Sequence, residues 1–243
     1  MKHTLCIGLD YIGSPYELPD CHLDAAQIEK RAKASGYETH TETGILGVKK
    51  FITQMAILRD GAGRNATTLI QYSGHGTQWQ SNKEPDGMQE GLCFWNGKNI
   101  EVLPDADFRA MVAQIPGTVY VFLDSCFSGG MERSAPEPRT WQKRCIQFNQ
   151  SFEIIMPDPN TAQVRKTKAP TNKIYLLLAC AESEVSWSTG NGGLFTKSFC
   201  AAYDRPKQKR TIKNIYNYIR DLSLDDQTPG YSIFGGNASK QIF

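Results

Sequence analysis

Short apolar runs that alternate with helical patterns constrain the fold of this chain more than any other feature of its sequence. Four runs have the length and apolar character of buried strands, at residues 4–9, 67–72, 118–123 and 173–180. Three segments between them have helical periodicity, at residues 24–35, 45–60 and 105–114. Strands that alternate with helices predict an α/β fold, with a mostly parallel central sheet and helices on both faces.

The remainder of the chain extends this pattern. An Asn96-Gly97 turn between two short extended runs predicts a hairpin over residues 91–100. Helices are expected at 194–203 and 211–224, and a last extended piece at 231–234. Residues 129–172 differ, because they are rich in proline and polar residues and lack periodicity. We therefore expect one domain over 1–243, with a large portion (1–128), a linker (129–172) and a small portion (173–243).

Composition excludes several classes of protein. Hydrophobic residues make up 40% and charged residues 21%, and the net charge of +2 predicts no nucleic-acid binding face. No apolar run is long enough to span a membrane, and the N-terminus lacks a signal-peptide core, so a cytoplasmic protein is expected. The seven cysteines form no CxxC pair, which argues against a zinc site or a disulfide framework.

Two strand ends carry residues with catalytic potential. The run that begins at Thr68 ends in Tyr-Ser-Gly-His75-Gly, and the run that begins at Val119 ends in Asp-Ser-Cys126-Phe-Ser-Gly. Neighbouring glycines let the backbone turn and leave each side chain uncovered. Parallel strands end at the same edge of a sheet, so His75 and Cys126 are expected to meet there.

A thiol paired with an imidazole is a nucleophile, because the thiolate attacks while the histidine manages the protons. Backbone N–H groups near Cys126, Gly74 and Gly76 are candidates to stabilise the oxyanion of a tetrahedral intermediate. Either residue alone is more simply explained as a structural histidine or a buried thiol. Their shared placement at strand ends favours catalysis.

These motifs, 51 residues apart from His75 to Cys126, resemble the metacaspase and paracaspase branch of the caspase-like cysteine peptidases. The resemblance extends from the first strand to about Ile233. It implies a caspase–hemoglobinase fold, a His75–Cys126 dyad and peptide-bond hydrolysis through an acyl-enzyme. It also implies protein or peptide substrates, no organic cofactor and a monomeric state.

The resemblance further implies a pocket for P1, the residue whose carbonyl group is attacked. The matching positions are Cys21, Asp24, Ser73 and Asp124. Independently, two carboxylates beside the nucleophile would bind a guanidinium or ammonium group and repel aspartate. We therefore expect cleavage after a basic residue, with arginine preferred over lysine because of its planar fork. Glu182 and Glu184 are candidates for the pocket rim, with ordinary surface acids as the alternative.

Calcium is a further expectation of the resemblance, which the residues support only in part. The candidate ligands are Asp86, Glu90, Asp105 and Asp107. Ala106 stands where a paired acid is usual, and Arg133 argues against a nearby cation. Asp107 is equally well explained as a helix-start acid.

The linker offers several cleavage points to an enzyme that cuts after basic residues, and it is expected either to be self-cleaved or to occlude the groove. The candidates are Arg133, Arg139, Arg144, Arg165, Lys166 and Lys168. Two alternatives stay open, a caspase-like peptidase that prefers Asp or Asn at P1 and a catalytically silent scaffold. An α/β hydrolase is disfavoured because the chain lacks a Gly-x-Ser-x-Gly elbow.

Overall fold

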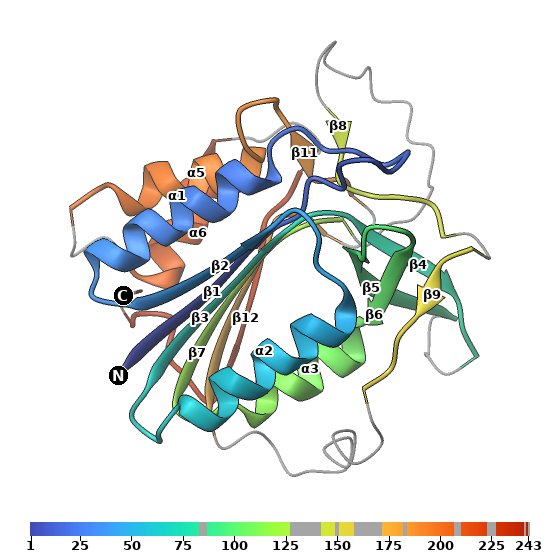
Figure 1. Cartoon of the computed structure of the whole chain (residues 1–243). Coiled ribbons are helices and arrows are strands. Elements are labelled where there is room, and N and C mark those ends of the chain that lie inside the picture. The colour runs from blue at the N-terminus through green and yellow to red at the C-terminus, as the bar shows by residue number, and fades with distance from the viewer. Residues whose placement is uncertain are drawn as a thin grey trace.

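The computed structural model of the chain describes residues 1–82, 87–126, 142–148, 151–157, 172–181, 184–206, 210–222, 227–240 and 242. A six-stranded sheet lies at its centre (Figure 1). Its strands, in spatial order, are β12 (Gly230–Phe234), β10 (Lys173–Leu178), β7 (Thr118–Asp124), β3 (Thr67–Ser73), β1 (Lys2–Gly8) and β2 (Glu38–Thr43). All neighbouring strands are parallel except β12, which pairs antiparallel with β10. The predicted mostly parallel sheet is confirmed.

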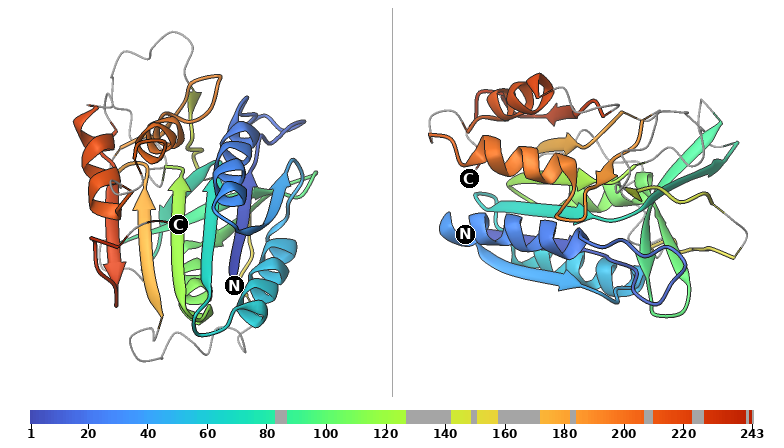
Figure 2. Two further views of the ribbon diagram at one scale, coloured as in Figure 1. Left: turned by 90° about the vertical axis from the view of Figure 1, so that its left-hand side faces the viewer. Right: turned by 90° about the horizontal axis from the view of Figure 1, so that it is seen from above.

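Helices cover both faces of this sheet (Figures 1 and 2). One face carries α1 (Cys21–Ala34), α5 (Leu194–Tyr203) and α6 (Ile212–Asp221), and the other carries α2 (Val48–Gly61) and α3 (Asp105–Gln114). Strand β7 is buried throughout, and its side chains point alternately into the two apolar cores, one on each face of the sheet. Val121 belongs to the core cluster that includes α2 and α3 residues, whereas Phe122 belongs to the one beneath α1, α5 and α6.

Two smaller sheets lie beyond the carboxyl ends of the central strands. One has the order β4 (Gly76–Gln80), β5 (Met88–Trp95), β6 (Ile100–Pro104) and β9 (Glu153–Ile154). Strands β5 and β6 are antiparallel neighbours, as the predicted hairpin required. The other sheet pairs β8 (Gln142–Lys143) with β11 (Trp187–Ser188), so a piece of the predicted linker lies against the segment before α5.

Some elements differ from the sequence prediction. Helix α1 begins at Cys21 rather than residue 24, and α2 begins at Val48 rather than residue 45. Strand β2 was not predicted, because its sequence Glu-Thr-His-Thr-Glu-Thr has no apolar face. It forms through pairing with β1 at the edge of the sheet, where polar side chains reach water.

None of the described helices combines the length and apolarity needed to cross a membrane. The three-part division of the chain stays a prediction.

Candidate active site

The predicted dyad lies where two adjacent strands of the central sheet end. Strands β3 and β7 pair in parallel with Ser73 opposite Asp124. His75 and Cys126 each follow two residues after these partners, at the same edge of the sheet. Both side chains are buried, with exposed fractions of 3% and 0%.

Backbone contacts set the orientation of His75. Its Nε2 lies 2.8 Å from the carbonyl oxygen of Tyr16, and the Tyr11 ring packs 4.7 Å from the imidazole centroid. A carbonyl can only accept, so Nε2 carries the proton and Nδ1 keeps its lone pair. Nδ1 has no hydrogen-bond partner among the described residues. Burial lowers the pKa of His75 to about 4; the charge of Arg144 acts in the same direction, and the backbone carbonyls of Tyr16 and Arg144 oppose it. The imidazole is therefore a neutral base.

The sulfur of Cys126 is held by the backbone before β11. The Ser186 N–H donates to Sγ at 2.6 Å, and the thiol lies 3.5 Å from the Ser186 carbonyl oxygen. Burial raises the pKa of the Cys126 thiol well above its ordinary value, although contact with the Cys145 thiol lowers it. The nucleophile is thus protonated in this state.

A peptide carbonyl occupies the position expected for an oxyanion. The carbonyl oxygen of Arg144 accepts hydrogen bonds from the N–H of Gly76 at 3.0 Å and of Cys126 at 3.3 Å. The prediction for Gly74 is corrected, because its N–H donates to the Asp124 carbonyl instead. A Cβ on Gly74 would lie 2.7 Å from the Tyr11 hydroxyl, so close packing explains this glycine.

The side chain of Arg144 fills a pocket of three carboxylates and is completely buried. Its Nη2 lies 2.9 Å from Asp20 Oδ1 and 2.7 Å from Asp24 Oδ2, while Nη1 lies 3.1 Å from Asp124 Oδ2. Nη1 also donates to Ser73 Oγ at 2.5 Å. We call Asp20, Asp24, Asp124 and Ser73 the carboxylate pocket.

Backbone N–H groups and hydroxyls hold the three carboxylates in place. The Gly193 N–H donates to Asp24 at 2.8 Å, and the Thr196 N–H, in the first turn of α5, donates to Asp124 at 3.0 Å. Asp20 accepts from the N–H groups of Gly190 and Gly192 at 2.8 and 2.9 Å. The helix N-terminus and these donors stabilise negative charge without neutralising it.

The carboxylates respond differently to this environment. Burial raises the pKa of Asp24 to about 6, with Arg144 lowering it and Asp124 raising it. Burial alone would also raise the pKa of Asp20. The charge of Arg144 and the hydrogen bonds from the Ser188 hydroxyl and the Gly192 N–H outweigh burial, so the pKa of Asp20 is lowered. The same carboxylates raise the pKa of Arg144 well above its ordinary value, against the effect of burial. The guanidinium is therefore charged, and it is the counter-ion of the pocket.

Three of the residues predicted for P1 binding, Asp24, Ser73 and Asp124, contact Arg144 directly. Cys21 is buried in the first turn of α1, and its thiol contacts Ser73. Sequence reasoning missed Asp20, which precedes α1 and resembles an N-cap. Its side chain makes no capping bond and points to Arg144 instead.

Glu184 does not belong to the described contacts of Arg144. Its carboxylate accepts from the Thr228 hydroxyl at 2.8 Å and from the Thr228 and Ala181 N–H groups. Glu182 lies outside the described residues. Glu184 therefore joins the loops that contain Ala181 and Thr228, in place of the position at the pocket rim that the sequence predicted.

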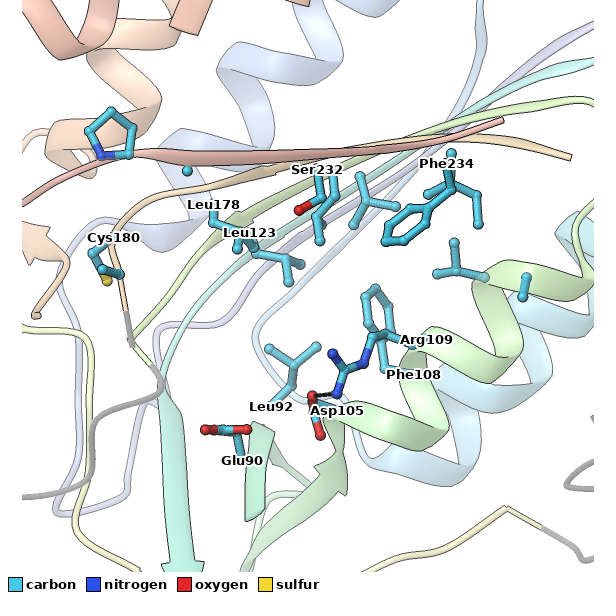
Figure 3. A pocket seen from close by; sticks show the side chains of 18 of the residues that line it. Glu90, Leu92, Asp105, Phe108, Arg109, Leu123, Leu178, Cys180, Ser232 and Phe234 are labelled. Atoms are coloured by element: carbon cyan, nitrogen blue, oxygen red, sulfur yellow. Dashed lines mark ion pairs between the residues drawn. The ribbon is translucent and has the colours of Figure 1, made fainter. Parts of the chain in front are cut away.

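Of the candidate calcium ligands, the structure describes Glu90, Asp105 and Asp107. Glu90 and Asp105 line an apolar cavity of about 870 Å³ between α3 and strands β7, β10 and β12 (Figure 3). Asp105 pairs with Arg109 and accepts from Gln89 at 2.7 Å. Asp107 is buried on α3. In the described part of the chain no group of three His, Cys, Asp or Glu side chains is arranged to hold a metal ion. Asp86 lies outside that part, so calcium binding stays a prediction.

The residues around Arg144 make backbone hydrogen bonds to both sides of the site. Gln142 and Lys143 form β8 against β11, and the Arg144 N–H donates to the Ser186 carbonyl at 3.0 Å. On the far side, the Ile146 N–H donates to the Gly76 carbonyl at 3.1 Å. The segment 142–146 is thus bound by backbone on both sides of the Arg144 carbonyl group.

Comparisons with known proteins show the family and the fold of this chain. The model of the caspase domain matches residues 1–234. Metacaspase-7 of Arabidopsis thaliana is 28% identical over 151 residues, covering 56% of this chain and 37% of that protein. Metacaspase-1 of Cryptococcus neoformans is 29% identical over 150 residues, covering 53% and 32%. The chain spans about a third of the length of these relatives.

Solved structures show the same fold. A protein from Geobacter sulfurreducens superposes with a TM-score of 0.74 and 23% identity, covering 97% of this chain and 94% of that one. Caspase-1 from Spodoptera frugiperda superposes with a TM-score of 0.58 and 14% identity, covering 96% and 85%. The fold is caspase-like, with distant homology to metacaspases over about half the chain. The chain therefore belongs to the caspase-domain family.

Proposed function

We propose that this protein is a cysteine endopeptidase that hydrolyses the peptide bond after an arginine or, more slowly, a lysine. One observation carries the proposal. Arg144 holds its guanidinium among three carboxylates while its carbonyl oxygen accepts hydrogen bonds from the N–H groups of Gly76 and Cys126. This is the arrangement that a bound substrate needs, with the side chain recognised and the reacting carbonyl group polarised.

The residues of the site support a two-step reaction. His75 Nδ1 accepts the thiol proton of Cys126, and the sulfur attacks the P1 carbonyl carbon. The N–H groups of Gly76 and Cys126 stabilise the negative oxygen. The C–N bond breaks, and the imidazolium gives its proton to the leaving amine. Water then hydrolyses the thioester, releasing the P1 carboxylate and restoring the thiol.

The first substrate of this reaction is a bond within the chain, between Arg144 and Cys145. Of the basic residues expected as linker cleavage points, Arg144 lies within the described residues, and the others lie outside them. While Arg144 fills the carboxylate pocket, no other P1 residue can enter. Cleavage leaves Arg144 tethered on one side only, so that it can leave and admit other substrates.

The alternative P1 preferences conflict with the charge of the pocket. An aspartate side chain would meet three carboxylates, and an asparagine would leave them without a counter-ion. Lysine offers one ammonium group in place of a planar fork that reaches all three. Loss of one charge-assisted hydrogen bond predicts a roughly 10- to 100-fold preference for arginine.

The proposal is tested with fluorogenic peptides that differ only in ending with Arg, Lys, Asp or Asn. Purified protein is assayed with calcium and with a chelator, because calcium binding is untested. We expect turnover after Arg and, more slowly, after Lys, and none after Asp or Asn. A peptide-arginine acyloxymethyl ketone should attach to Cys126, as peptide mapping would show.

Two cysteine variants provide the matched comparison. Cys126→Ala should abolish turnover and labelling. Cys6→Ala removes a buried thiol on β1, outside the site, and should retain both. Turnover only after Asp or Asn would refute the pocket assignment. An inert protein that the arginine ketone also fails to label would favour a catalytically silent scaffold.

A further inference from the structure

Strand β8, which directly precedes Arg144, places Lys143 against a defined surface. Strands β8 and β11 are antiparallel, with Lys143 directly opposite Trp187 and Gln142 opposite Ser188. The Arg144 N–H bonds to Ser186, which fixes the register of this pairing. If Arg144 is a P1 residue, Lys143 occupies the P2 position and Gln142 the P3 position.

Trp187 presents an aromatic face to the Lys143 ammonium group. The Nζ atom lies 5.8 Å from the centroid of the Trp187 ring, within the range of a cation–π interaction. Trp187 is 3% exposed, so its ring is held by surrounding protein rather than free to rotate. Tryptophan is the side chain that attracts a cation most strongly in this geometry.

The neighbouring positions are bound differently. Gln142 is exposed, so its side chain contributes little to recognition. Ile146 is buried in the core cluster beneath α2 and α3, which suits an apolar side chain on the leaving-group side. Of the two residues before Arg144, Lys143 is therefore the one whose side chain the site binds.

We propose that Trp187 forms a binding site for a cationic P2 side chain, so that the enzyme selects peptides with two consecutive basic residues, Lys-Arg above all. The inference rests on the proposed function and adds a second specificity position to it. Backbone pairing with β11 binds any extended peptide. The indole face then distinguishes a cation from a neutral side chain of equal length.

The expected preference is modest and measurable. A cation–π contact at an exposed site corresponds to about 2- to 5-fold in a rate or binding constant, and a desolvated one to about 30-fold. Lys143 is half-buried, so we expect a value between these limits. Because the three carboxylates also attract any cation at longer range, the test must separate their effect from that of the indole.

Three peptides, acyl-Gln-X-Arg with a fluorogenic amide, provide the test with X as lysine, norleucine or glutamate. Norleucine keeps the lysine stem without its charge. In the wild-type protein we expect kcat/KM for lysine to exceed that for norleucine by about 5- to 30-fold, and glutamate to be slowest. The ratio of lysine to norleucine is insensitive to how much of each preparation is folded.

Trp187→Leu should lower this ratio to between 1 and about 2, and Trp187→Phe should give an intermediate value. Trp79→Leu is the matched control, because this ring stacks on Phe148, on the other side of the cleaved bond. It should leave the ratio unchanged. In all variants arginine should remain preferred at P1.

The outcomes separate the two proposals. Equal turnover of the lysine and norleucine peptides would overturn the inference while leaving the proposed function intact. A lysine preference that survives in Trp187→Leu would also overturn it, and would assign the effect to the carboxylates. If no peptide ending in arginine were cut, the proposed function would fail and the P2 preference with it.

Discussion

The carboxylate pocket and the apolar cavity beneath α3 use the central sheet in opposite ways. The pocket lies at the carboxyl ends of the strands, between α1 and α5, and is filled by a guanidinium that meets three carboxylates. The cavity, of about 870 Å³, lies on the other face and is lined mainly by aliphatic and aromatic side chains (Figure 3). Buried charges need particular partners, whereas apolar surface does not. The pocket therefore defines its ligand, and the cavity does not.

The largest expected difference concerns two arginines, one in each region. Arg144→Ala leaves three buried carboxylates without their counter-ion, so it should lower the free energy of unfolding by about 3 to 5 kcal/mol. Arg109→Ala removes an ion pair of a 65% exposed side chain and should cost at most about 1 kcal/mol. Denaturant unfolding in a Cys126→Ala background measures both without self-cleavage.

A small guanidinium ligand provides the control. Agmatine should raise the melting temperature of the Arg144→Ala variant, because the empty pocket binds it, and should leave the Arg109→Ala variant unchanged. Equal destabilisation by the two substitutions, with no agmatine effect, would contradict the contrast between the regions.

The effect of Arg144→Ala should depend on pH. The pKa of Asp24 in the fold, about 6, lies above its ordinary value, so stability falls as pH rises between about 4 and 6. Without Arg144 this pKa rises further, and the loss extends to higher pH. The difference in unfolding free energy between the variant and its parent should therefore be larger at pH 8 than at pH 5. An equal difference at both would show that Asp24 does not sense Arg144.

Two serines extend the comparison to neutral groups. Ser73 donates to Asp24 at 2.6 Å and accepts from Arg144, so Ser73→Ala should cost about 1.5 to 3 kcal/mol. Ser232 lines the cavity, and Ser232→Ala should change the unfolding free energy by no more than about 0.5 kcal/mol. Thermal unfolding of both variants tests this, and a larger loss for Ser232→Ala would reverse the assignment.

The smallest expected effect is a gain. Ser232→Val adds apolar volume inside the cavity at a strand position that favours a branched side chain, and should stabilise by about 0.5 to 1 kcal/mol. Denaturant unfolding measures the gain. Destabilisation instead would indicate that the cavity has no room for the added methyl groups beside Ser232.

The sequence could predict those parts of the molecule whose signals are local. The apolar runs of β1, β3, β7 and β10 gave the central sheet, and glycines placed His75 and Cys126 at strand ends. The resemblance to metacaspases, rather than a local signal, assigns Asp24 and Asp124 to the P1 pocket. The polar edge strand β2 was missed, since its formation depends on pairing with β1.

The contacts that define the occupied site have no local signal. Tyr16 orients His75 through a backbone carbonyl, which any residue provides. Asp20 resembles an ordinary helix-start acid. Arg144 is one of several basic residues in an aperiodic segment, and β8 pairs with β11 over only two residues. These contacts arise from tertiary structure, so the sequence predicts occlusion by the linker and includes Arg144 among six candidates without singling it out.

The most direct test of this account is the intact mass of the purified chain after incubation, compared with that of Cys126→Ala. The account predicts that the wild-type protein separates into two fragments and that the second begins at Cys145, while the variant stays whole. A wild-type chain that stays whole, or that Cys126 cuts at another bond while Arg144–Cys145 remains intact, would contradict the claim that Arg144 is bound as a substrate.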